Sequence, residues 1–206
     1  MSFREPMTAH DRVLVLATLN RAKARELVAL LGDVPFALRM LADYPGAVAP
    51  EENETTYRGN ALLKARAAAR LTGSWSLGDD SGLEVDALGG APGLYSARYG
   101  GPGLDDAGRR ALLLDALRDV PDDRRTARFR CVIAIVDPEG REWVVEGVAE
   151  GTITREPRGE GGFGYDPLFY YPALGRTFAE LSDAEKSNVS HRGRAAIEAR
   201  RVLIAS

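Results

Sequence analysis

The stretch VLVLATLNRAKARELVALLG, residues 13–32, decides the fold. It opens with a short apolar run, which is typical of a buried strand. Asn20 follows as a good N-cap, and the residues up to Leu31 predict a helix that ends at Gly32. A buried strand that leads directly into a helix favours the α/β class.

Strand and helix patterns alternate along the rest of the chain. We expect further strands at residues 36–41, 74–77, 83–85, 128–136 and 142–150, with a tight turn at 78–82 and a hairpin formed by the last two strands. We expect helices at residues 57–71, 106–117 and 192–204, and a short one that a capping box opens at 182–185. Loops are expected at residues 42–55 and 155–166. This pattern predicts an α/β protein with a mixed sheet.

The composition argues against several classes of function. The formal net charge of -3 provides no global field for nucleic acid or an anionic membrane. No apolar run approaches membrane-spanning length, and residues 1–12 lack the apolar core of a signal peptide, so we expect a cytoplasmic protein. Cys131 is the only cysteine, and its apolar surroundings predict a buried core residue. We expect an N-terminal extension at 1–12 and one folding unit at 13–206.

Two adjacent carboxylates, Asp79 and Asp80, lie in the expected turn at 78–82. Bringing like charges together is costly, and partial burial raises that cost. A divalent cation removes it, and Mg²⁺ prefers one or two protein carboxylates together with water and substrate phosphates. Because successive strand side chains point to opposite faces, only one of the pair needs to face a site. The alternative is an acidic turn in which aspartate caps the backbone.

Further candidates precede this turn. Glu51 and Glu52 form a second acidic pair, which could supply a metal ligand or remain solvated. Residues 18–23, TLNRAK, lead into a helix N-terminus, whose free N–H groups and dipole favour an anion. The alternative is an ordinary capped amphipathic helix. Asn60 and Lys64 share one face of the next helix, which could contact the same phosphate or be a solvated stripe.

The C-terminal third has an unusual composition. Residues 161–167, GGFGYDP, place aromatic side chains between glycines, and an aromatic face can stack on a nucleobase. Lys186 and residues 190–192, SHR, add cations beside a helix start, where they could donate to base carbonyls or phosphate oxygens. Taken singly, the loop could be a plain turn and His191 a helix cap or a surface residue.

Six sequence blocks together resemble the inosine/xanthosine triphosphate pyrophosphatase family, the non-standard purine NTP pyrophosphatases. The blocks are VLATLNRAKARE (15–26), GNALLKA (59–65), DDSGL (79–83), GGAPGLYSAR (89–98), GGFGYDP (161–167) and EKSNVSHR (185–192). They follow the family's order, and the resemblance extends from Val13 to the final helix. Leu19 and Ala22 depart from it, because they stand where glycine is usual and add side chain where backbone should approach phosphate.

The resemblance implies an elongated two-lobed α/β fold with a mixed central sheet flanked by helices, an active-site cleft between the lobes, and a homodimer. It implies Mg²⁺-dependent hydrolysis of dITP, ITP and XTP to the monophosphate and pyrophosphate, which cleanses the nucleotide pool. The triphosphate would be held by Thr18, Leu19, Asn20, Arg21, Ala22, Lys23 and Lys64. The general base or metal ligand would be Asp80, with Glu52 and Asp79 as further ligands. Substrate would also contact Ser81. The base and sugar pocket would be lined by Phe163, Gly164, Tyr165, Asp166, Lys186, His191 and Arg192.

Selection of the base is expected to depend on hydrogen-bond donors. Hypoxanthine and xanthine present an O6 acceptor where adenine has an amino donor, so a donor such as Arg192 would leave the adenine amino group unpaired. Two alternatives stay open: a related enzyme that acts on modified pyrimidine nucleotides, and a module that binds purine nucleotides without turnover. The adjacent Asp79 and Asp80 argue against the second, since binding alone does not need crowded carboxylates.

Overall fold

The computed structural model describes residues 12–206, so the expected extension at 1–12 lies, apart from Arg12, outside the described residues. The strands are β1 (Val13–Leu16), β2 (Ala37–Met40), β3 (Trp75–Val85), β4 (Thr126–Val136), β5 (Glu142–Ile153), β6 (Phe169–Tyr171) and β7 (Arg176–Thr177). The α-helices are α1 (Arg21–Leu31), α2 (Tyr57–Thr72), α3 (Asp106–Ala116), α4 (Asp183–Val189) and α5 (His191–Ala205).

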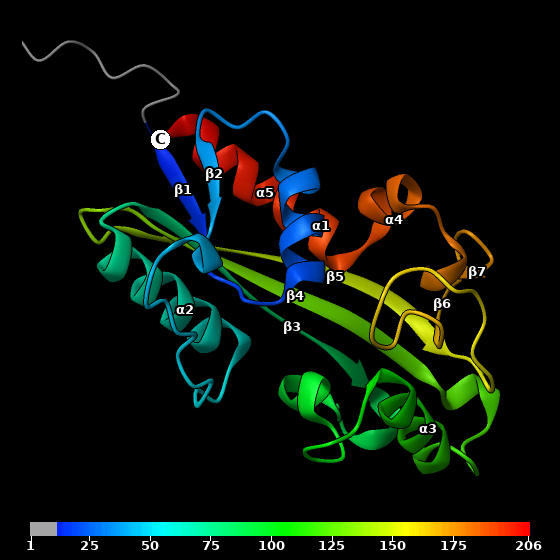
Figure 1. Cartoon of the computed structure of the whole chain (residues 1–206). Coiled ribbons are helices and arrows are strands. Elements are labelled where there is room, and N and C mark those ends of the chain that lie inside the picture. The colour runs from blue at the N-terminus through cyan, green and yellow to red at the C-terminus, as the bar shows by residue number, and fades with distance from the viewer. Residues whose placement is uncertain (1–11) are drawn as a thin grey trace, which may run out of the picture. The chain divides into compact units, whose positions relative to one another are not determined.

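The strands form a mixed sheet in the order β2-β1-β3-β4-β5-β6-β7, which Figure 1 shows. The expected α/β class with a mixed sheet is therefore confirmed. By its internal contacts the chain divides into two compact units. Unit 1 contains residues 12–80, 132–145 and 195–206, and unit 2 contains residues 81–131 and 146–194.

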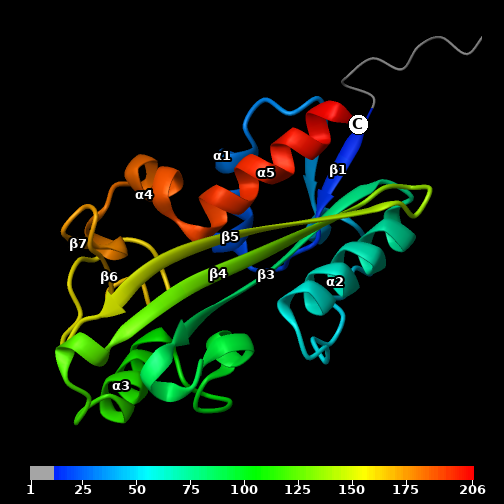
Figure 2. The ribbon, with the colours of Figure 1, turned by 180° about the vertical axis from the view of Figure 1, so that it is seen from behind.

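Unit 1 is built around β1, which pairs in parallel with β2 on one side and β3 on the other. Helix α2 lies on one side of these strands, and α1 and the end of α5 lie on the other, in both views (Figures 1 and 2). A parallel strand covered on both faces is apolar throughout, which explains the uninterrupted run at 13–17. Val15 and Ala17 pack against Ala68 of α2 and Leu41, as one of the core clusters of this unit.

The helix ends follow the expected capping signals. The side chain of Asn20 accepts hydrogen bonds from the N–H groups of Ala22 and Lys23 at the start of α1, and Gly32 follows its last residue. Helix α2 ends at Gly73, which has the left-handed φ of 63° that favours glycine. These predictions of helix bounds are confirmed because capping is a local interaction between residues a few positions apart.

The prediction of a tight turn at residues 78–82 is wrong, because β3 runs without interruption through these residues. Gly78 forms no turn. A glycine is required at this position because the backbone of α2 approaches β3 closely. A Cβ atom at this position would lie 2.4 Å from the carbonyl oxygen of Ala61 and 2.8 Å from the backbone nitrogen of Ala65. Asp79 and Asp80 are therefore strand residues, both of them buried.

Unit 2 has an aromatic core. The rings of Phe129, Phe169 and Phe178 pack together, with centroids 4.7 Å apart for the first two and 4.8 Å for the last two. The expected hairpin is confirmed: β4 and β5 are sheet neighbours, and their connection at 137–141 is too short for a parallel return. Cys131 is fully buried, as expected.

Strands β6 and β7 were not expected from the sequence. They span three and two residues, too few for an alternating pattern to emerge. Among residues 12–206, no helix combines the length and the apolar composition needed to cross a membrane.

The substitution Gly78→Ala tests the close approach of β3 to α2. We expect it to lower the free energy of unfolding by about 1–3 kcal/mol, because the new methyl group collides with helix backbone that cannot move alone. Chemical denaturation of both proteins measures the difference. In the matched control Gly73→Ala the Cβ meets open space, and the cost of about 1 kcal/mol comes from the left-handed φ alone. A Gly78→Ala protein as stable as the wild type would contradict the account.

Candidate functional site

One group of candidate residues lies in unit 1, and we call it the lysine–carboxylate cluster. It brings together side chains from α1, α2, β3 and the loop before α2, namely Lys23, Glu52, Asn60, Lys64, Asp79 and Asp80. Lys64 Nζ lies 2.7 Å from Glu52 Oε1 and 3.7 Å from Asp80 Oδ1. Asn60 Nδ2 donates to Asp80 Oδ2 at 3.0 Å. One buried ammonium group therefore serves two carboxylates.

The adjacent aspartates point to opposite faces of β3, as strand geometry requires. Asp80 meets Lys64 and Asn60 of α2, whereas Asp79 Oδ2 lies 3.3 Å from Lys23 Nζ of α1. The two helices lie on opposite sides of the strands, as Figure 1 shows. The fold thereby separates two like charges that the sequence places next to each other, and gives each one a lysine.

Burial and neighbouring charges change the proton affinities of the cluster. Burial raises the pKa of Asp80 and Glu52 raises it further, while Lys64, Asn60 and Lys23 lower it without cancelling the rise. Burial lowers the pKa of Lys64, but the nearby carboxylates outweigh this effect and leave that pKa above its ordinary value. Lys64 thus stays charged, and Asp80 is more basic than an exposed aspartate.

The cluster has the right chemistry for a hard cation. Its two lysines and three carboxylates sum to +2 − 3 = −1, so one further positive charge would be stabilised. Within residues 12–206, no three His, Cys, Asp or Glu side chains gather as a ready metal cage. Mg²⁺ does not need such a cage, because it binds one or two carboxylates and completes its shell with water and phosphate oxygens. Asp80 and Glu52, which already share one cation in Lys64, fit that requirement.

The start of α1 differs from the expectation of free backbone donors. The N–H groups of Ala22 and Lys23 are bound by the side chain of Asn20, whose own N–H donates to Thr18 Oγ1 at 3.1 Å. An anion at this helix end would therefore find part of its donor set in use. Leu19, where the resemblance led us to expect glycine, is 48% exposed.

Another group of candidates lies in unit 2, around the loop at residues 161–167, which we call the glycine–aromatic loop. The N–H of Phe163 donates to Asp166 Oδ2 at 2.9 Å, and Lys186 Nζ lies 2.7 Å from the same oxygen. Lys186 Nζ is 5.1 Å from the centroid of the Phe163 ring, and Arg192 Cζ is 5.6 Å from it. The structure therefore gathers an aromatic ring and two cations, a combination suited to a nucleobase.

Arg192 is held by a residue next to the catalytic candidate. Its Nη2 donates to Ser81 Oγ at 3.0 Å, and the side chain is almost completely buried. Ser81 directly follows Asp80 in β3. Ser81 and Arg192 both belong to unit 2.

Two predicted pocket residues are occupied in packing. Tyr165 is buried in the core of unit 2, where its hydroxyl donates to the carbonyl oxygen of Ser96 at 3.0 Å and burial raises its pKa. The ring of His191 is 4% exposed and stacks on Phe129, with 4.6 Å between centroids. Both side chains therefore pack with the core of unit 2.

Asn60, which the sequence offered together with Lys64 as a possible phosphate contact, holds Asp80 directly. Its side-chain oxygen also accepts from the N–H of Glu54 at 3.1 Å, so the amide joins β3 to the loop that carries Glu52. The sequence signal for it was its position four residues before Lys64, on the same helix face.

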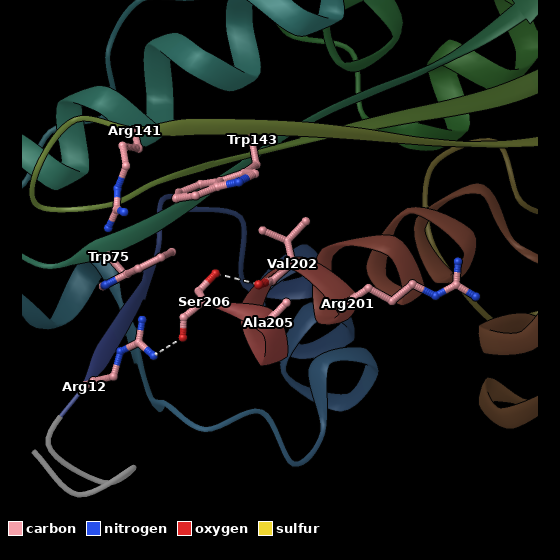
Figure 3. A pocket seen from close by; sticks show the side chains of 8 residues that line it. All are labelled: Arg12, Trp75, Arg141, Trp143, Arg201, Val202, Ala205 and Ser206. Carbon is pink, nitrogen blue, oxygen red and sulfur yellow. Dashed lines mark hydrogen bonds between the residues drawn. The ribbon is translucent and has the colours of Figure 1, made fainter. Parts of the chain in front are cut away.

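A separate pocket of about 570 Å³ lies in unit 1, and none of the predicted site residues line it (Figure 3). Its lining consists of Arg12, Trp75, Arg141, Trp143, Arg201, Val202, Ala205 and Ser206. The two indole rings stack on each other, with 5.4 Å between centroids. Arg141 and Arg201 form ion pairs with Asp137 and Glu198, and Arg12 donates to a main-chain oxygen of Ser206, so each arginine of this pocket already has a partner.

The stability of an Asp80→Asn variant tests the electrostatics of the cluster. Since the pKa of Asp80 is raised in the folded state, its ionised form costs folding free energy at neutral pH, and its stabilising contribution is lost as pH rises through the folded pKa. The amide keeps the shape without the charge. We therefore expect a Tm at pH 7 at least equal to that of the wild type, with a difference that shrinks toward pH 4. Thermal denaturation from pH 4 to pH 8 measures it.

Asp137→Asn is the control for that experiment. Although burial opposes it, hydrogen bonds from Arg141 lower the pKa of Asp137, so its ionised form contributes stability above the unfolded pKa. Its asparagine variant should lose stability at pH 7. An Asp80→Asn protein that loses as much at pH 7 would show that the cluster stabilises the ionised form.

Known proteins resemble this chain over nearly all of its length. The Ham1 family matches residues 14–202. A dITP/XTP pyrophosphatase of Desulforamulus reducens is 53% identical over 92% of this chain and 94% of its own, and one of Geobacter sulfurreducens is 50% identical over 88% and 92%. A solved HAM1 protein from Coxiella burnetii has a TM-score of 0.87 at 42% identity, over 95% of this chain and 100% of that one. The match includes both groups of candidate residues, and this chain belongs to the Ham1 family.

Proposed function

We propose that this protein hydrolyses the non-standard purine nucleotides dITP, ITP and XTP to the monophosphate and pyrophosphate, with Mg²⁺ as its cofactor. The observation that carries the proposal is the buried carboxylate of Asp80, held by Asn60 and Lys64 beside Glu52. Relatives named dITP/XTP pyrophosphatase support the same substrates. The protein is accordingly a nucleoside-triphosphate pyrophosphatase, a hydrolase of phosphoanhydride bonds that cleanses the nucleotide pool.

The reaction requires a base for the attacking water. Water attacks the α-phosphorus, the bond to the oxygen that bridges the α- and β-phosphates breaks, and pyrophosphate departs. Asp80 accepts the proton that the water loses. Burial raises the pKa of Asp80 and so makes it a stronger base than an exposed aspartate. Asn60 fixes the orientation of the carboxylate through Oδ2.

The negative charge of the triphosphate requires cations. Lys64 remains protonated at neutral pH. Both Lys64 and Lys23 exchange part of their carboxylate contacts for phosphate oxygens when substrate binds. A Mg²⁺ ion held by Asp80 and Glu52, with Asp79 as a further candidate, would neutralise the charge that develops on those oxygens. Residues 18–23, which lead into the start of α1, hold the triphosphate.

The purine is recognised by the residues of unit 2. The ring of Phe163 offers a stacking face, and Lys186 and Arg192 offer donors beside it. Such donors match the O6 acceptor of hypoxanthine or xanthine and meet a donor when adenine is bound. Because Ser81 holds Arg192 in place, this donor is fixed before substrate arrives.

We also propose a homodimer in the cytoplasm, with residues 13–206 as one catalytic domain of two lobes. The two compact units support the two lobes, and the family match across residues 14–202 supports a single domain. The net charge of -3 argues against nucleic acid and anionic membranes as partners.

The variant Asp80→Asn tests the proton acceptor. We expect pyrophosphate release from ITP to fall at least about a hundredfold, the usual scale for loss of a general base. The assay measures kcat with ITP at several Mg²⁺ concentrations. Asp137→Asn is the matched control, because it also removes a buried carboxylate, at the hairpin turn of unit 1, and should leave kcat near the wild-type value. A wild-type rate in Asp80→Asn would transfer the role to Asp79 or Glu52.

The variant Arg192→Ala tests selection of the base. We expect kcat/KM for ITP to fall by an amount equivalent to about 2–4 kcal/mol, while ATP hydrolysis changes little, because the lost donor serves only an O6 acceptor. A panel of ITP, XTP, GTP, ATP and a modified pyrimidine nucleotide gives the ratios. Arg192→Lys, which keeps the charge and much of the volume, separates loss of the planar donor from loss of folding. An equal fall for every nucleotide would instead place Arg192 at the phosphates or in folding alone.

A further inference from the structure

Two side chains of α3 bind the backbone of the glycine–aromatic loop at residues 161–167. The N–H of Gly164 donates to Asp106 Oδ2 at 2.9 Å, and Arg110 Nη1 donates to the carbonyl oxygen of Gly164 at 2.8 Å. Asp106 and Arg110 are four residues apart and so lie on the same face of the helix. Both backbone groups of one glycine are thus bound by one helix, and we call this pair of side chains the α3 clamp.

Gly164 depends on these hydrogen bonds for its position. Its φ of 61° is in the left-handed region, and apart from Gly164 itself and its chain neighbours no atom lies within 4 Å of the place where a Cβ would stand. Side-chain packing therefore does not hold this residue. At its N–H group Phe163 is held by Asp166, whose carboxylate accepts a hydrogen bond from it. The α3 clamp is the corresponding attachment on the Gly164 side.

We propose that the α3 clamp positions the ring of Phe163 for stacking on the purine, and so sets the affinity and selectivity for the base. The inference rests on the proposed function, in which Phe163 stacks on the substrate. A loop that is ordered before binding does not lose further conformational freedom when the nucleotide arrives. Asp106 is 52% exposed, so the clamp adds little to the stability of the fold and acts mainly on loop geometry. Asp106 and Arg110 are positioning residues.

The test combines steady-state kinetics with a double-mutant cycle. In Arg110→Ala we expect KM for ITP to rise about five- to tenfold, the scale of one charge-assisted hydrogen bond at a partly exposed site, with kcat within about twofold of wild type. Asp106→Ala should behave in the same way, whereas Asp106→Asn, which keeps an oxygen to accept from Gly164, should stay within about twofold. Hydrogen exchange at the amide of Gly164 should become faster in Asp106→Ala and remain slow in Asp106→Asn.

The cycle uses Phe163→Ala. If the clamp acts through the ring, adding Arg110→Ala to Phe163→Ala should raise KM by less than about twofold, because the contact that it positions is already gone. The matched control is Arg118→Ala, which removes an arginine that pairs with Asp115 near the end of α3, and should leave KM unchanged. The full five- to tenfold rise in the Phe163→Ala background would overturn this inference while the proposed function stands. A wild-type protein that does not hydrolyse ITP would overturn both.

Discussion

Two consecutive negative charges on a buried strand are the constraint on which the rest of this structure depends. Asp79 and Asp80 are both buried, and a buried carboxylate without a partner would cost several kcal/mol. The fold meets this requirement with a helix on each side of β3, each of which brings one lysine to one aspartate. Gly78 permits the close approach of α2 on which the second pairing depends.

The same arrangement explains why the cluster is suited to chemistry. Three carboxylates and two lysines in a poorly hydrated place leave one negative charge uncompensated, and burial raises the pKa of Asp80. The carboxylate of Asp80 is therefore suited to accept a proton, and the cluster is suited to bind a cation. Stability alone would be better served by apolar residues at these positions, since a buried ion pair rarely improves on them. The proposed function gives these charges a purpose that stability alone does not.

Local signals in the sequence predicted much of the fold. Asn20, Gly32 and Gly73 mark helix ends because capping involves neighbouring residues, and the structure has these ends as expected. The prediction for residues 78–82 was wrong because it, too, relied on local signals alone. Its glycines and aspartates have the composition of a turn, but Lys23 and Lys64, distant in sequence, stabilise it as a strand. Tertiary partners overrode local preference at that point.

The sequence predicted the residues of the candidate site better than it predicted the residues that hold them in place. The motifs indicated Lys64, Phe163 and Arg192, but the contacts of Asp106 and Arg110 with Gly164 join positions 58 and 54 residues apart. No periodicity or motif relates such positions. Likewise the stacking of His191 on Phe129 depends on the assembled core of unit 2, and the sequence offers no sign of it.

The alternation of Asp79 and Asp80 across β3 also governs how the chain can tolerate changes in length. A single residue inserted in β3 before Gly78 would turn every later side chain of the strand to the other face. Asp80 would then meet α1, Asp79 would point away from Lys23, and the close approach at Gly78 would fall on a residue with a side chain. Loops can absorb such an insertion, whereas this strand would have its two faces exchanged. Length variation in proteins built on this pattern should accordingly be confined to the connections, with the spacing between β1 and the aspartates adjusted only in the helices and loops.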